Sequence, residues 1–134
     1  MIDSEPHYGR GCLTLVVDDD PRIRGYIKTI LRSANVQILE AGDGSEALEL
    51  FRVWRGKIDL VITDIRMPRM TGTDLATSLR SDCPNMPVIF VSGEPAAAFT
   101  EFQNNQTVFI EKPFGPRALL DAARRFFDFI PAAC

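Results

Sequence analysis

The sequence predicts an α/β protein whose five-stranded parallel sheet is covered by helices on both faces. Short apolar runs alternate with longer amphipathic segments along most of the chain, which is the pattern of repeated strand–helix units. The runs at 13–17 and 58–63 are almost entirely apolar, as central strands between two helical layers should be. A length of 134 residues is enough for one domain with a sizeable core.

The elements are expected to follow one another in five units. Strands are predicted at 13–17, 36–41, 58–63, 88–92 and 107–111, and helices at 21–34, 45–55, 72–81, 96–103 and 115–130. Asp20 suits a helix cap and Pro21 the first helical position. Turn residues at 42–44 precede the second helix, and the prolines within 82–87 end the third.

This alternation favours the doubly wound, flavodoxin-like strand order 2-1-3-4-5. Ligands of such sheets bind beyond the carboxyl ends of the strands, between the first and third strands. Residues 12–130 are expected to form one domain, with a flexible polar arm at 1–11 and a short tail at 131–134.

The composition argues against several functional classes. A formal net charge of −3 gives no electrostatic footprint for nucleic acid or an anionic membrane. No apolar stretch approaches the roughly 20 residues of a membrane span, and residues 1–11 lack a signal-peptide centre, so a cytoplasmic location is expected. His7 is the only histidine, and the three cysteines lie far apart, which argues against a histidine-based metal centre and a zinc site.

Charged side chains end or follow three of the predicted strands. Asp18-Asp19-Asp20 follow the first strand, Asp64 follows the third, and Lys112 follows the fifth. Parallel strands would bring these groups to one edge, where crowded carboxylates stay ionised only with a cation among them. Mg²⁺ fits best, because it takes oxygen ligands and keeps several water molecules.

The chemistry expected at this edge is phosphoryl transfer. A carboxylate such as Asp64 can attack phosphorus and form an acyl phosphate. Lys112 would place a positive charge near the phosphoryl oxygens, and Ser92, at the end of the fourth predicted strand, would donate from its hydroxyl. Each residue alone has an ordinary structural explanation, so the prediction depends on their joint occurrence at strand ends.

Four ordered segments carry a resemblance to a known family. They are Leu-Val-Val-Asp-Asp-Asp-Pro (15–21), Val-Ile-Thr-Asp-Ile-Arg-Met-Pro (61–68), Val-Ser-Gly (91–93) and Glu-Lys-Pro-Phe (111–114). Through them, residues 12–130 resemble the CheY-like receiver domain of two-component response regulators. The resemblance implies a signalling domain, not an enzyme beyond its own phosphorylation and dephosphorylation, whose partner is a histidine kinase or histidine phosphotransfer protein.

The resemblance also implies the roles of individual residues. Asp64 would be the phosphoacceptor, and Mg²⁺ would be held by Asp18, Asp19, Asp64 and the backbone carbonyl of Arg66. Ser92 and Lys112 would contact the phosphoryl group, with a cis bond between Lys112 and Pro113.

A conformational switch is implied as well. Ser92 would move toward the phosphoryl group while Phe109 turns inward, and Phe109, which has no hydroxyl, is expected to be weakly anchored outside. Arg66 and Glu94 stand at the two positions that tune phosphoryl lifetime, and their opposite charges predict a pair across the site mouth.

The predicted output surface combines the segments 96–103, 107–111 and 115–130. The apolar band of the last helix is wider than one sheet face needs, which favours contact with an output protein or self-association there, or a cover formed by the C-terminal tail.

Two alternatives remain open on the residues alone. One is a haloacid dehalogenase-like phosphatase using Asp18, although Pro21 and the lack of a cap insertion argue against it. The other is a receiver-like binding module that is not phosphorylated, which the complete acidic set with Lys112 disfavours. The aspartate that carries the phosphoryl group distinguishes them: Asp18 for the phosphatase, Asp64 for the receiver.

Overall fold

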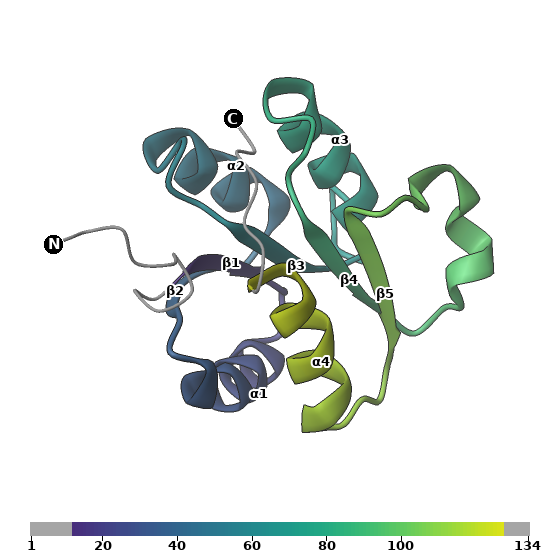
Figure 1. Cartoon of the computed structure of the whole chain (residues 1–134). Coiled ribbons are helices and arrows are strands. Elements are labelled where there is room, and N and C mark those ends of the chain that lie inside the picture. The colour runs from purple at the N-terminus through teal and green to yellow at the C-terminus, as the bar shows by residue number, and fades with distance from the viewer. Residues whose placement is uncertain (1–11, 128–134) are drawn as a thin grey trace, which may run out of the picture.

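The structure, a computed structural model, describes residues 12–127. Five parallel strands form one sheet in the order β2-β1-β3-β4-β5 (Figure 1), which confirms the predicted α/β fold and strand order. The strands are β1 (Leu13–Val17), β2 (Gln37–Ala41), β3 (Leu60–Asp64), β4 (Val88–Ser92) and β5 (Thr107–Glu111). The helices are α1 (Pro21–Leu31), α2 (Gly44–Val53), α3 (Gly72–Asp82) and α4 (Pro116–Phe127), with the 3-10 helices η2 (Arg32–Ala34) and η3 (Ala96–Phe102).

Three predicted segments cannot be compared with the structure. The arm at 1–11, the tail at 131–134 and the last residues of the final predicted helix, 128–130, lie outside the described residues. Among the residues that are described, no helix combines the length and apolar character needed to cross a bilayer.

The sheet separates two layers of helices, α2 and α3 on one side and α1 and α4 on the other (Figure 1). Leu15 and Val17 of β1 face the layer formed with α2 and α3, while Val16 faces the layer formed with α1 and α4. All of β1, β3 and β4 is buried, because helices cover both faces of these central strands. The polar side chains of Asp18, Asp64 and Ser92 lie at or just beyond the carboxyl ends of these strands.

Side chains at the helix starts fix the loops beside that edge. Asp20 caps α1, as predicted, by accepting a hydrogen bond from the Arg22 backbone N–H at 2.9 Å. Thr71 and Asp74 form a reciprocal capping box at the start of α3. The loops after β1 and β3 thus lead into helices with defined first turns.

The segment predicted as a helix at 96–103 is the 3-10 helix η3, which is interrupted at Phe99 (φ −132°, ψ 52°). No side chain caps its start, where Pro95 is extended. Its two parts together span seven residues, a length at which an α-helix does not offset its own nucleation cost.

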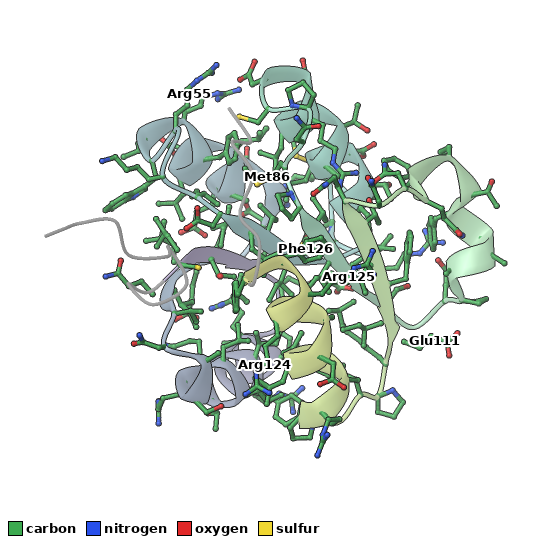
Figure 2. All side chains as sticks on the ribbon, in the orientation of Figure 1. Arg55, Met86, Glu111, Arg124, Arg125 and Phe126 are labelled. Carbon is green, nitrogen blue, oxygen red and sulfur yellow. The ribbon has the colours of Figure 1, made fainter. Side chains whose placement is uncertain are left out.

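The wide apolar band of the last helix has a structural explanation. Leu119, Ala122, Ala123, Phe126 and Phe127 are all buried, because α4 packs against both the sheet and α1. The expectation of surplus apolar surface is therefore wrong for the described part of this helix. Its exposed face carries arginines, and Figure 2 shows Arg124 and Arg125 leaving it in different directions.

Candidate functional site

The carboxyl edge of the sheet gathers three acidic side chains. Asp18 follows β1 and Asp64 ends β3, and because Val17 pairs with Thr63 the two aspartates lie at the same level of neighbouring strands. One carboxylate oxygen from each of Asp18, Asp19 and Asp64 lies within 4.8 Å of the other two. The predicted convergence of these carboxylates is therefore present in the structure.

The three carboxylates differ in their exposure to solvent. Asp18 is 1% exposed and Asp64 is 8% exposed, whereas Asp19 is exposed. Burial, together with the neighbouring Asp64 charge, raises the pKa of Asp18, although the Asp20 backbone N–H and Lys112 act in the opposite direction. A buried carboxylate whose charged form is disfavoured is a favourable partner for an added cation.

Lys112 lies between the two buried carboxylates. Its Nζ is 3.4 Å from Asp64 Oδ2 and 3.5 Å from Asp18 Oδ2. The peptide bond between Lys112 and Pro113 is cis, as the resemblance implies. The Lys112 backbone N–H donates to the Ser92 carbonyl at 2.7 Å, so the end of β4 and the lysine are directly connected.

Ser92 stands one position beyond the residue paired with Asp64. In the register of β3 and β4, Asp64 pairs with Val91, which places Ser92 at the same edge. Ser92 is 2% exposed, and its Oγ accepts a hydrogen bond from the Glu94 backbone N–H at 2.9 Å. A hydroxyl that accepts one hydrogen bond keeps its own hydrogen for another acceptor.

Asp20, the third aspartate of the run, is turned away from this cluster. Both of its carboxylate oxygens accept hydrogen bonds from the Arg22 side chain, at 3.2 and 3.0 Å, and these bonds lower the pKa of Asp20. Asp20 therefore serves helix α1, as its cap position predicts.

Arg66 and Glu94 form an ion pair with two hydrogen bonds, as their opposite charges predict. Arg66 Nη2 donates to Glu94 Oε2 at 2.6 Å, and Arg66 Nε donates to Glu94 Oε1 at 3.2 Å. The Glu94 carboxylate raises the pKa of Arg66. Because Arg66 follows Asp64 and Glu94 follows Ser92, each by two positions, the pair joins the loops after β3 and β4.

Phe109 is held by aromatic neighbours. Its ring stacks on Phe90 with centroids 5.1 Å apart and on Phe99 with centroids 5.9 Å apart. The expectation that a missing hydroxyl leaves this ring weakly anchored overlooks both contacts. Phe99 belongs to η3, so a rotation of Phe109 would break an aromatic contact between β5 and η3.

Gly72 also shapes this site, a role that is not predicted from the sequence. Its backbone N–H donates to the Ile65 carbonyl at 2.9 Å. A Cβ at this position would lie 3.0 Å from the Asp64 carbonyl carbon and the Ile65 Cα, and closer still to the Asp64 carbonyl oxygen. Only glycine lets α3 begin directly against the backbone of Asp64. The glycine is visible in the sequence, but its close approach is not.

Comparison with known proteins gives one consistent family. The model of the response regulator receiver domain matches residues 14–124. Over 122 residues the chain is 32% identical to the sensor kinase CckA of Brucella abortus, a match that covers 90% of this chain and 13% of that protein. The chain spans less than half the length of the curated relatives it matches first, between 13% and 44%.

Solved structures agree in fold. A response regulator receiver protein from Sinorhizobium medicae superposes with a TM-score of 0.79 at 26% identity, covering 88% of this chain and 95% of that one. The response regulator TrrA of Thermotoga maritima, solved in complex with Mg²⁺–BeF, gives a TM-score of 0.75 at 28% identity, covering 86% and 98% of the two chains.

Proposed function

The chain belongs to the family of response regulator receiver domains, and on this premise we propose that Asp64 accepts a phosphoryl group from a histidine kinase or histidine phosphotransfer protein. The observation that carries the proposal is the cluster at the carboxyl edge, where Asp18, Asp19 and Asp64 converge and Lys112 contacts two of them. In this proposal the receiver domain comprises residues 12–130 and works in the cytoplasm. Phosphoryl donors that obtain their phosphoryl group from ATP are found there.

Asp64 is the proposed nucleophile because it ends a central strand at the edge of the sheet and, at 8% exposure, is less deeply buried than Asp18. A carboxylate oxygen of Asp64 would attack the phosphorus of a phosphohistidine, forming a P–O bond. The P–N bond breaks, and its electron pair stays with the imidazole nitrogen, which takes up a proton. Lys112, 3.4 Å from the Asp64 carboxylate, is placed to offset charge on the phosphoryl oxygens. Ser92 keeps a hydroxyl hydrogen to donate.

The acidic cluster fits Mg²⁺ in its donor chemistry. All three side chains supply oxygen, which this cation prefers, and an exposed carboxylate such as Asp19 leaves room for water and a phosphoryl oxygen. Asp18, Asp19, Asp64 and the backbone carbonyl of Arg66 are the proposed ligands. When bound, the ion would neutralise negative charge shared between the carboxylates and the incoming phosphoryl group.

The ion pair between Arg66 and Glu94 is the proposed control of phosphoryl lifetime. Because its two bonds bridge the loops after β3 and β4, it would restrict the approach of water to Asp64. Replacing either residue with alanine should speed the loss of the phosphoryl group, measured as decay of the phosphorylated mass after removal of the donor. Decay at the wild-type rate in both variants would rule out this role.

The proposed output surface consists of η3, β5 and α4. Ser92 would follow the phosphoryl group, and Phe109 would leave its contacts with Phe90 and Phe99, shifting the population between two packings. Gln103, Asn104 and Arg125 line a hollow beside Phe109. Ala96 and Val108 line the same hollow, so an output partner or a second copy of the chain would meet polar, charged and apolar groups there.

Incubation with Mg²⁺ and acetyl phosphate, followed by intact mass measurement, tests the proposal. We expect one added phosphoryl group in the wild type and none in Asp64→Asn. Asp20→Asn is the matched control, since Asp20 belongs to the same acidic run but bonds Arg22, and it should be modified as the wild type is. Modification lost on Asp18→Asn but kept on Asp64→Asn would instead indicate the phosphatase alternative, and an unmodified wild type would indicate the binding module.

A further inference from the structure

Arg24, on the second turn of α1, contacts the loop that carries the acidic cluster. Its Nη1 donates to the Asp18 backbone carbonyl at 2.6 Å, and its Nε donates to Glu40 Oε1 on β2 at 3.1 Å. The Arg24 side chain is 20% exposed, so the guanidinium lies largely within the protein. It connects the end of β1 with the neighbouring strand β2.

The Asp18 carbonyl belongs to the peptide unit that joins Asp18 to Asp19. Strand β1 ends at Val17. The last backbone hydrogen bond from this segment to β2 is that of the Asp18 N–H, which donates to the Ala41 carbonyl at 3.2 Å. The Asp18 carbonyl lies beyond the sheet, and the guanidinium of Arg24 takes the place of a strand partner. Holding that carbonyl fixes the plane of the peptide unit, and with it the direction in which both aspartates leave the backbone.

Glu40 balances the charge that this contact introduces. Glu40 accepts from Arg24 and also from Lys28, whose Nζ lies 2.6 Å from Glu40 Oε2. Both bonds lower the pKa of Glu40, and the bond from Lys28 has the larger effect. A positive guanidinium beside a cation site would otherwise repel the cation, and an ionised Glu40 offsets it.

We infer that Arg24 is a positioning residue for the proposed magnesium site: by holding the Asp18 carbonyl it orients the carboxylates of Asp18 and Asp19 for the ion. This inference rests on the proposed function, since it assumes that the acidic cluster binds Mg²⁺. Arg24 acts through the Asp18 backbone and Glu40 compensates its charge. Groups that orient metal ligands in this way typically change metal affinity by about 10- to 100-fold when removed.

Lys28 offers a matched control on the same helix. Arg24→Met and Lys28→Met each remove one positive charge and one partner of Glu40, but only Arg24→Met loses the contact with the Asp18 carbonyl. Titration of Mg²⁺ into each metal-free protein by calorimetry measures affinity without any phosphorylation step. Melting temperatures in EDTA report how far each substitution loosens the packing of α1 on β2.

Arg24→Met should weaken Mg²⁺ binding by about 10-fold, while Lys28→Met stays within about twofold of the wild type, even if both melt at similar temperatures. Equal affinities in the two variants would overturn the inference. If Arg24→Met does not fold, Glu40→Gln carries the test: an uncompensated guanidinium should weaken Mg²⁺ binding by about threefold, and unchanged binding would count against the inference. A wild type that binds no Mg²⁺ would refute the proposed site itself, which is a separate result.

Discussion

Replacing Gly72 with alanine should destabilise the protein through a single methyl group. The new Cβ would lie 3.0 Å from the Asp64 carbonyl carbon and the Ile65 Cα, whereas carbon atoms prefer separations of about 3.5–4.0 Å. The start of α3 would have to retreat by at least about half an ångström to satisfy these carbons, and further to clear the Asp64 carbonyl oxygen. All the atoms involved belong to the backbone, so no side chain can rotate away.

The expected cost combines two terms. Overpacking in a well-packed region typically costs about 1–3 kcal/mol. Lengthening the hydrogen bond from Gly72 N–H to the Ile65 carbonyl, now 2.9 Å, adds about 0.5–1.5 kcal/mol. A loss of about 1.5–4.5 kcal/mol should lower the melting temperature by roughly 10 °C in a domain of this size. Phosphorylation by acetyl phosphate should also slow, because Asp64 moves with its carbonyl.

Gly25→Ala is the control for this experiment. Gly25 lies within α1, and a Cβ there meets no atom within 4 Å. The same chemical change should therefore stabilise the protein by about 0.5–1 kcal/mol, since alanine suits a helix interior better than glycine does. Thermal unfolding followed by circular dichroism measures both effects. If Gly72→Ala melts within about 2 °C of the wild type, the close-approach argument is refuted.

Two further substitutions test the electrostatic statements. Asp18→Asn in EDTA should raise the melting temperature near neutral pH, but not near pH 3.8, the ordinary pKa of Asp. The pKa of Asp18 is raised in the folded protein. Its contribution to stability is therefore present below pH 3.8 and is lost as pH rises through the folded-state pKa. A pH-independent difference would contradict this. Arg80→Met should cost about 2–3 kcal/mol, because the half-buried guanidinium donates to the carbonyls of Met86 and Gln106. The control Arg55→Met, which removes an exposed ion pair, should cost under about 1 kcal/mol, and equal costs in a denaturant titration would refute the assignment.

The sequence predicts the sheet and its functional edge well, for a physical reason. A buried parallel strand must be apolar throughout and must expose its carboxyl end, so the β1 and β3 segments and the acids that follow them can be recognised from local composition. The pair Arg66 and Glu94 was also predictable, because the family resemblance marks both positions and the two residues carry opposite charges.

Contacts between distant elements could not be predicted in this way. Arg24 reaches partners six and sixteen residues away on other elements, and nothing in the local pattern of α1 distinguishes it from Lys28. Phe109 depends on Phe99, whose position follows from the break within η3. Sequence patterns locate the elements, whereas the contacts that fix the site depend on how the elements approach one another.

The acidic run after β1 illustrates this limit most directly. Three identical side chains occupy three environments: Asp18 is buried, Asp19 is exposed, and Asp20 is bonded to Arg22 as the cap of α1. Because Asp20 is not part of the cluster, the cluster consists of the carboxylates of Asp18, Asp19 and Asp64. They lie beside one positive group, the ammonium of Lys112. The negative charge that remains when these groups are ionised equals the charge of one divalent cation. If a phosphoryl group also enters, its oxygens add negative charge that Lys112 alone cannot offset, so the proposed transfer to Asp64 requires the cation that the cluster is suited to hold.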